Sequence, residues 1–345
     1  VAGLVDDPDP DVRRQVCLLL TEHRRGGTLW DALSDETRAQ VVESAKARMQ
    51  VETDPDLRIL AASVIGREID RLCNEARQAT GRSDLGKAKT LLEQAQALDP
   101  ESLYARICLV RYHLRVGDRA KGLELAEAFG ALLRVPRLSK APTVDGDPTD
   151  PVWEEALSKE EGFYHSTSRW VARHTEGRTA AYVGHRDQVL YIAVRGFEPD
   201  LDKLVIQHHN RDSNVWQDDC VEIFLDPGNT EKNVYQFVIN AAGALFDLYN
   251  RKKRENFKAE VASGIFRDRG YWGCEFAIAA AELKGSSLAP ESLWGFNLYR
   301  TRIGGASECC AWWPPYGGNH RYHLFPVMVF EDAAPSSTAK APAEE

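Results

Sequence analysis

Three short runs in which apolar and polar residues alternate lie between Cys220 and Tyr249. The first run, Cys220–Asp226, ends at a Pro-Gly-Asn turn, and the second, Val234–Asn240, is followed by an Ala-Gly turn that leads into Leu245–Tyr249. A period of two is typical of strands with one buried face, and turn residues between such runs reverse the chain. The stretch therefore predicts a β-meander, which limits this part of the chain to a sheet-based fold.

Further strands are predicted on both sides of the meander. With so many alternating runs and little helix, a two-sheet antiparallel β-sandwich is the expected fold of this half. A single helical turn is expected at Ala279–Lys284, and residues 332–345, rich in Ala, Pro, Ser, Thr and Glu, are expected to be disordered. The additional strands are Thr179–Gly184, Gln188–Arg195, Glu260–Arg267, Tyr271–Ala279, Trp294–Arg302 and Val327–Glu331.

The first half of the chain shows helical spacing instead. Asp-Pro-Asp-Val-Arg at Asp9 recurs as Asp-Pro-Asp-Leu-Arg at Asp54, about 45 residues later, and each copy resembles the start of a HEAT-type repeat helix. From Leu85 the pattern resembles tetratricopeptide repeats, with a helix that closes at Asp99-Pro100. We therefore predict all-α helical repeats over residues 1–134, HEAT-like over 1–70 and tetratricopeptide-like over 71–134.

Composition changes sharply near residue 140. Of the 31 Phe, Trp and Tyr residues, 27 lie after it, and so does the whole net charge of −9, because residues 1–140 hold 22 basic and 22 acidic side chains. Residues 135–151 contain four prolines and are predicted to be a linker that merges into the opening of a sandwich at 141–331. An acidic sandwich is a poor phosphate binder, which disfavours nucleic acid as a ligand. No apolar run approaches the length of a membrane span.

A tryptophan and several acids stand at the start of the meander. Trp216 is followed by Asp218, Asp219 and Glu222. A flat aromatic ring can pack on the apolar face of a pyranose while carboxylates accept hydrogen bonds from its hydroxyls, so these residues are consistent with sugar recognition. They are equally consistent with a tryptophan that caps a sandwich edge beside solvated acids.

The pattern W-x-D-D-x-V-E-I-F-L-D-P from Trp216, followed by Y-x-F-V-I-N-x-x-G from Tyr235, resembles the family 9 carbohydrate-binding modules. The resemblance covers roughly residues 141–331 and implies a β-sandwich that binds polysaccharides or glycans without catalysis. It continues, in the family's order, through three further segments: Val144–Ala156, Gly270–Ile278 and Trp294–Arg300.

The resemblance also implies a site in which two aromatic rings hold the sugar. Trp216 matches the first ring and Glu222 a hydroxyl-binding acid, with Asp219 beside them, whereas Val238 stands where the family has an arginine. The second ring is displaced along the chain. The nearest candidates for it are Trp312, Trp313, Tyr316 and Tyr322, of which the first three lie in a stiff, proline-containing run.

Metals and cofactors receive little support from the residue types. The resemblance implies structural calcium in some members, for which Asp145, Asp147, Asp218 and Asp226 are the candidate ligands, and no cofactor is required. The chain has no C-x-x-C pair, which argues against a structural zinc site. Cys309 and Cys310 can be two free thiols or a strained vicinal disulfide.

We predict a non-catalytic carbohydrate-binding module attached to a helical repeat scaffold. The chain begins without Met inside a repeat pattern, so a longer protein is expected, in the cell envelope or secreted. One alternative is a protein-interaction scaffold that binds a partner through the repeats and uses the sandwich structurally. Another is the accessory module of a glycoside hydrolase. Catalysis by this chain is disfavoured, because no pair of carboxylates is singled out by an apolar setting.

Overall fold

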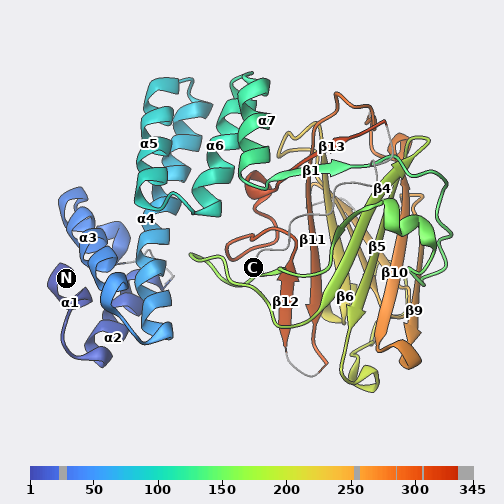
Figure 1. The fold of residues 1–345 in the computed structure, drawn as a ribbon, viewed down its shortest axis with the longest axis horizontal. Coiled ribbons are helices and arrows are strands. Elements are labelled where there is room, and N and C mark those ends of the chain that lie inside the picture. The colour runs from blue at the N-terminus through green and yellow to red at the C-terminus, as the bar shows by residue number, and fades with distance from the viewer. Residues whose placement is uncertain (23–28, 252–256, 285, 305–306, 333–345) are drawn as a thin grey trace. The chain divides into compact units, whose positions relative to one another are not determined.

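The structure is a computed structural model that describes residues 1–22, 29–251, 257–284, 286–304 and 307–332. The chain divides into two compact units, each described by itself (Figure 1). The helical unit comprises residues 1–129 together with 167–172 and 316–318. The sandwich unit comprises the rest of the described chain. No helix within the described residues is long and apolar enough to cross a membrane.

The helical unit is built mainly from antiparallel helices whose starts are capped by short polar side chains. Asp9 accepts a hydrogen bond from the backbone N–H of Asp11, and Asp54 accepts from the N–H groups of Asp56 and Leu57. The predicted helix starts at these two Asp-Pro sequences are therefore confirmed. The described α-helices are α1 Ala2–Val5, α2 Pro10–Thr21, α3 Asp35–Val51, α4 Pro55–Gly81, α5 Leu85–Leu98, α6 Leu103–Arg115 and α7 Arg119–Ala128.

Helix α4 crosses the predicted border between HEAT-like and tetratricopeptide-like repeats. It runs unbroken from Pro55 to Gly81, so the border at residues 70 and 71 falls inside one helix. The physical reason is that residues 56–80 contain no proline and only one glycine, Gly66, to interrupt the helix. The two repeat names thus remain resemblances, and the structure establishes an all-helical region.

Two segments from much later in the sequence complete the helical unit. The Trp170 indole N–H donates to the Thr21 carbonyl oxygen at 3.2 Å, and the Arg67 guanidinium lies 4.7 Å from the centre of the Trp170 ring. The backbone of Trp170 comes so close to α4 that a Cβ atom at Gly66 would lie 2.1 Å from its carbonyl oxygen. The helical unit therefore differs from the continuous segment 1–134 predicted from the sequence, because it also uses residues 167–172 and 316–318.

The sandwich unit consists of two sheets with strong antiparallel pairing. In the larger sheet the order is β1-β13-β11-β6-β7-β8, with β12 beside β11 and β3 beside β12, and in the smaller sheet it is β2-β4-β5-β10-β9. The strand β1 pairs in parallel with β13. The strands are β1 Leu132–Val135, β2 Leu157–Lys159, β3 Tyr164–His165, β4 Thr179–Arg186, β5 Val189–Phe197, β6 Cys220–Pro227, β7 Tyr235–Asn240, β8 Leu245–Tyr249, β9 Glu260–Phe266, β10 Tyr271–Ala279, β11 Trp294–Arg302, β12 Glu308–Ala311 and β13 Val327–Phe330.

The predicted meander is confirmed as β6, β7 and β8, which are neighbours in the larger sheet. The other predicted strands are also present within one or two residues of their expected ends, and the expected helical turn is a 3-10 turn at Ala280–Glu282. The predicted disordered tail, apart from Asp332, lies outside the described residues. All seven cysteines, Cys309 and Cys310 included, are free thiols.

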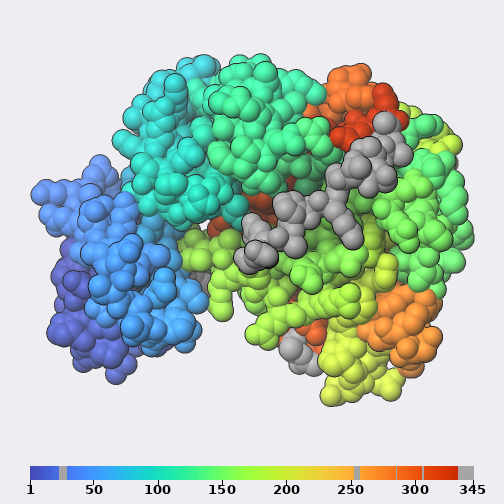
Figure 2. All heavy atoms as spheres, viewed as in Figure 1, coloured from blue at the N-terminus to red at the C-terminus, as the bar shows by residue number. Residues whose placement is uncertain are grey.

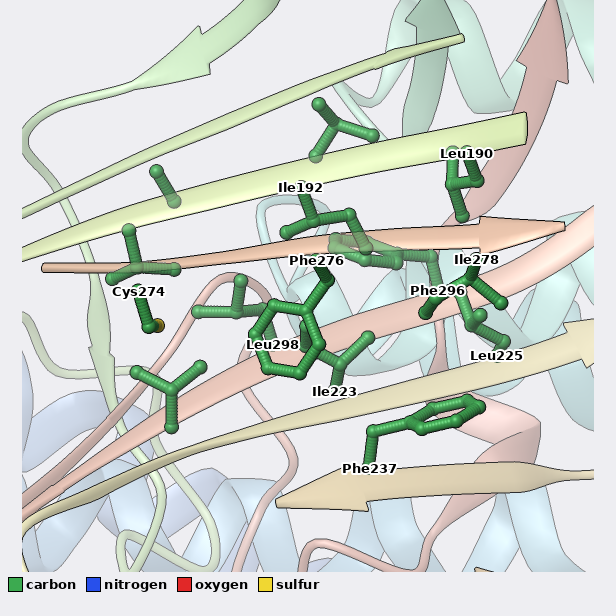
Figure 3. Close-up of a cluster of buried hydrophobic side chains, with 14 of the residues drawn as sticks. Leu190, Ile192, Ile223, Leu225, Phe237, Cys274, Phe276, Ile278, Phe296 and Leu298 are labelled. Carbon is green, nitrogen blue, oxygen red and sulfur yellow. The ribbon is translucent and has the colours of Figure 1, made fainter. Parts of the chain in front are cut away.

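The main core lies between the two sheets. Figure 3 shows Ile192 of β5 and Phe276 of β10 facing Ile223 of β6, Phe237 of β7 and Phe296 of β11. These residues alternate with others that point away from the core, so every second side chain of each strand is buried between the sheets. This packing fixes which side chains of the larger sheet point outward, and it thereby defines the outer face of that sheet.

Residues 135–151 are attached to both sheets and are not a free linker. Val135 is the last residue of β1, and the Leu138 N–H donates to the His185 carbonyl oxygen of β4 at 2.9 Å. Further on, the Trp153 indole N–H donates to Glu275 of β10 at 2.9 Å. The predicted linker is corrected accordingly, because buried side chains and backbone hydrogen bonds hold this segment on the sheet. The helical stretch of the chain ends at Ala128, before the predicted residue 134.

Candidate functional site

A row of side chains crosses the outer face of the larger sheet from β11 to β8. Tyr299 pairs with Glu222, Glu222 with Val238, and Val238 with Phe246, so the four lie side by side on neighbouring strands. Adjacent strands are about 4.8 Å apart, which places the Cα atoms of Glu222 and Phe246 about 10 Å from each other. Val238, at the position where the resemblance implies an arginine, is fully buried between them and packs in one cluster with Phe246 and Val215.

Glu222 is the one carboxylate in this row. Its side chain is largely buried, and its two oxygens accept hydrogen bonds from the Gln236 amide at 2.8 Å and from the Asn319 amide at 3.2 Å. Burial raises the pKa of Glu222, although the two amide hydrogen bonds act in the opposite direction. A carboxylate has about four acceptor positions, so two amide donors leave it capacity for a further hydroxyl donor.

Trp216 lies at one end of the row. It follows Val215 in a short 3-10 turn just before β6, and its ring meets Phe246 edge to face with centroids 4.8 Å apart. Trp216 is 39% exposed, whereas the other tryptophans among the described residues of the sandwich unit are buried. A rigid ring with one supported edge and free surface is suited to stacking on a ligand.

A second group of rings lies next to Phe224, two residues along β6 from Glu222. The His320 ring meets Phe224 edge to face at 5.4 Å, and the Tyr322 ring lies 6.1 Å from Phe224 and 5.9 Å from His320. Burial lowers the pKa of His320, with the nearby Arg251 adding to the effect, and burial raises the pKa of Tyr322 to about 12. Part of the His320 ring packs on Phe224 while the residue as a whole remains exposed, so it can present an aromatic surface to a ligand.

The acids that follow Trp216 have structural roles. Asp218 is fully buried and accepts from the His208 backbone and ring at 2.9 and 3.0 Å and from the Asn240 amide at 2.8 Å. Burial opposes ionisation of Asp218, but these hydrogen bonds lower its pKa overall. Asp219 accepts from the backbone N–H groups of Val205, Ile303 and Gly304 at 2.7 to 3.1 Å. Both acids are buried and join loops to the sheet, and the hydrogen bonds of Asp219 tie it to loop backbone.

Of the four candidates for the second ring, Tyr322 lies beside Phe224, and the other three lie elsewhere. Trp312 lies in the inter-sheet core, where it contacts Phe163 and Phe296. Trp313 is also buried, and its backbone exchanges hydrogen bonds with the Asn297 side chain. Tyr316 belongs to the helical unit, with its ring 5.0 Å from that of Tyr104. The stiffness of this run serves packing, and the rings nearest to Glu222 come from the loop that follows it.

The four candidate calcium ligands are separated. Asp147 accepts from Arg269 and Tyr271, while the backbone N–H of Asp145 donates to Glu275 of the smaller sheet. Asp218 and Asp226 lie before and near the end of β6, about eight residues apart on an extended strand, or about 27 Å. The described residues contain no group of three or more His, Cys, Asp or Glu side chains arranged to hold a metal. These aspartates therefore do not form one site.

Three residues of the row and its surroundings were missed by the sequence reasoning. Gln236 and Asn319 supply the amides that orient Glu222, and His320 supplies a ring. Gln236 could have been found from the sequence, because it is a polar residue at a position of β7 whose side chain points away from the core. Asn319 and His320 lie in an irregular loop, and only the paired geometry reveals their position beside Glu222.

Strand β6 does not place a second carboxylate close to Glu222. A hydrolase needs a second carboxylate within about 5 to 9.5 Å of the first. The next acid on β6 is Asp226, four residues away or about 13 Å along the strand, and its oxygens accept from Thr230 and the Glu231 N–H. Glu222 can thus accept hydrogen bonds from a ligand beside aromatic surfaces, without a partner on the strand for acid–base catalysis.

The sandwich unit is an antiparallel-rich β-sandwich that resembles family 9 carbohydrate-binding modules. Residues 144–309 match the model of the family described as "Carbohydrate family 9 binding domain-like", which consists of non-catalytic binding modules. The chain thus contains a domain similar to family 9 carbohydrate-binding modules, preceded by a helical region. A search of curated proteins finds no match.

Solved structures show distant similarity to the chain. A family 9 carbohydrate-binding module from Caldicellulosiruptor kristjanssonii in complex with cellotriose has 17% identity and a TM-score of 0.43, covering 62% of this chain and 100% of its own. The glucose complex of a family 9 module from the same organism has 16% identity and a TM-score of 0.44, covering 60% and 100%. A Bacteroides uniformis protein proposed to bind carbohydrate has 15% identity and a TM-score of 0.46, covering 58% and 99%.

Proposed function

We propose that the sandwich unit binds a polysaccharide or glycan chain on the outer face of the larger sheet. A sugar ring stacks on Trp216, its hydroxyls donate to Glu222, and the rings of His320 and Tyr322 limit the other side. The proposal rests on one observation: an amide-oriented carboxylate, Glu222, lies between an exposed tryptophan and a second aromatic group.

The chemistry of the row favours uncharged sugars. Glu222 is the carboxylate of the row, and its low exposure means that a ligand carboxylate beside it would meet uncompensated negative charge. A neutral hydroxyl gains instead, because a hydrogen bond to an ionised acceptor is shorter and stronger than one between neutral groups. Val238 has an apolar side chain and offers no hydrogen-bond donor to an anion. We therefore expect neutral hexose polymers to bind better than uronic acid polymers.

A protein-interaction scaffold with a structural sandwich is the alternative, and one specific observation favours it. The family's arginine position holds Val238, and the rings of Trp312 and Trp313 are buried, so the site retains only part of the expected contacts. In that case the outer face of the larger sheet would have no affinity for any glycan.

Binding of the full chain to a panel of soluble polysaccharides tests the proposal. Affinity electrophoresis identifies ligands, and isothermal titration with their oligosaccharides gives the dissociation constant. His320→Ala should weaken binding about 3- to 10-fold, because an exposed ring is removed without disturbing the core. His209→Ala, at another exposed histidine of the same unit, is the matched control and should leave binding unchanged. A wild-type chain that binds no member of the panel would instead support the scaffold function.

A further inference from the structure

We propose that the helical unit carries a second binding surface, an acidic groove between α3 and α5, that takes a basic amphipathic peptide segment of a protein partner. The groove is a hollow of about 590 Å³, and its floor is formed by α4. Helices α3, α4 and α5 are the blue to cyan elements in Figures 1 and 2. This surface belongs to the helical unit alone and is independent of the proposed sugar site.

The three helices present apolar side chains to the groove at helical spacing. Val42 from α3 and Leu72 from α4 are buried at its base, while Leu91 and Leu98 of α5 are half-exposed along its wall. Residues seven apart on a helix lie on the same face, so Leu91 and Leu98 form one continuous apolar edge. An apolar side chain of leucine size inserted here would contact these four residues and lose part of its contact with water.

The charges around this floor have one dominant sign. Asp35, Glu43, Glu68 and Glu75 line the groove against a single cation, Arg71, which gives its lining a formal charge of −3. Arg38 and Lys46, which pair with Asp35 and Glu43, lie outside this lining. A groove of this sign attracts cationic ligands and disfavours phosphates and other anions.

Arg71 already pairs with two acids of the groove, Glu68 and Glu75. The acids that a partner's cations can contact are therefore those at the rim. The Arg71 guanidinium donates to Glu68 at 2.6 Å and to Glu75 at 2.5 Å, and these hydrogen bonds raise its pKa. At the rim, Asp35 and Glu43 have side chains that are 87% and 72% exposed, and each pairs with a cation three residues further along α3, Arg38 or Lys46. Because the acid of each pair is exposed, a partner's Lys or Arg can reach its carboxylate.

The combination selects a peptide with alternating character. The apolar side chains of the groove favour one or two leucine-sized side chains in a ligand, and the acids of the rim favour Lys or Arg beside them. These are the features of a basic amphipathic segment. The exposed Ala39 and Ala97 leave the groove open between the rim and the floor. Larger side chains at these two positions would close it.

The test uses the full chain and a fluorescein-labelled 14-residue peptide of Leu and Lys with helical periodicity. Two matched peptides, one with Glu for Lys and one with Ser for Leu, separate the contributions of charge and of the apolar face. We expect the Leu/Lys peptide to bind in fluorescence polarisation, with affinity that falls as salt is raised, and both matched peptides to bind at least about tenfold more weakly.

Two pairs of variants locate the binding. Ala97→Arg fills the groove and should abolish binding, whereas Gln96→Arg adds the same charge to the same helix outside the groove and should not. The double variant Asp35→Asn with Glu43→Gln should weaken binding about 3- to 10-fold, since it removes two exposed charge contacts. Its control, Glu36→Gln with Glu93→Gln, changes the net charge equally at acids outside the lining. Failure of the Leu/Lys peptide to bind, equal binding of the Glu peptide, or equal loss in variant and control would overturn the proposal.

Discussion

Replacement of Trp216 by alanine is the most direct perturbation of the sugar site. A tryptophan side chain has roughly 250 Å² of surface, so an exposed fraction of 39% leaves about 100 Å² available to a ligand. At about 25 cal/mol per Å², complete coverage of that area would stabilise a complex by about 2.5 kcal/mol, which is an upper bound. A pyranose covers part of the ring and is itself partly polar. We therefore expect Trp216→Ala to cost about 1 to 2 kcal/mol, a 5- to 30-fold weaker dissociation constant.

Folding has to be separated from binding in this experiment. The Trp216 ring also meets Phe246 edge to face, a contact worth about 0.5 to 1.5 kcal/mol, so the variant should melt at a somewhat lower temperature. Titrations are therefore made well below that temperature, on protein with a native near-ultraviolet circular dichroism spectrum. Trp216→Tyr, which keeps a smaller ring, should lie between alanine and wild type. Leu85→Ala, at an exposed leucine of the helical unit, should have no effect. An unchanged dissociation constant in folded Trp216→Ala would refute the site.

Three further predictions follow from the hydrogen bonds and pKa shifts. Burial raises the pKa of Glu222, so the native state holds this proton more tightly than the unfolded state and must ionise a buried group as pH rises. The stability of Glu222→Gln relative to wild type should therefore increase as pH is raised above the ordinary glutamate pKa of 4.5. Urea unfolding at each pH measures this difference, and a flat difference would contradict the reasoning. Asp219→Asn should lose about 1 to 3 kcal/mol, since an amide cannot accept from three backbone N–H groups, whereas Asp268→Asn, at an exposed acid, should lose almost nothing. Trp170→Ala in the full chain should speed amide hydrogen exchange in α4 around Gly66, and unchanged exchange there would show that this contact does not support the helix.

The fold was largely predictable where elements were long enough to show a period. Nine strands and the helix starts at Asp9 and Asp54 were placed from alternation and capping residues. The strands β1, β2, β3 and β12 were missed because two to four residues cannot display a period of two. The border proposed inside α4 was wrong for the opposite reason, since it relied on motif similarity in a stretch without a helix-breaking residue.

The site was predictable only in part, because exposure cannot be read from residue type. Trp216 is partly exposed, whereas Glu222, Asp219 and Trp312 are buried. The alternation of β6 suggested one solvated face, yet its residues 220–226 are all buried, because loops cover the outer face as well. The hydrogen-bond partners of Glu222 come from β7 and from a loop about 100 residues away, a pairing that no local pattern contains.

The interleaved path of the helical unit has a consequence for how this protein is made. During synthesis the ribosome releases residues 1–129 long before Trp170, and Tyr316 later still, although all three belong to the same compact unit. The surface around Gly66 and Tyr104 therefore stays uncovered on the newly made helices until most of the sandwich unit has been synthesised. A stop codon or a slow ribosome anywhere between residues 130 and 315 would leave an incomplete helical unit, a species that the cell's chaperones and proteases would encounter in place of a finished domain.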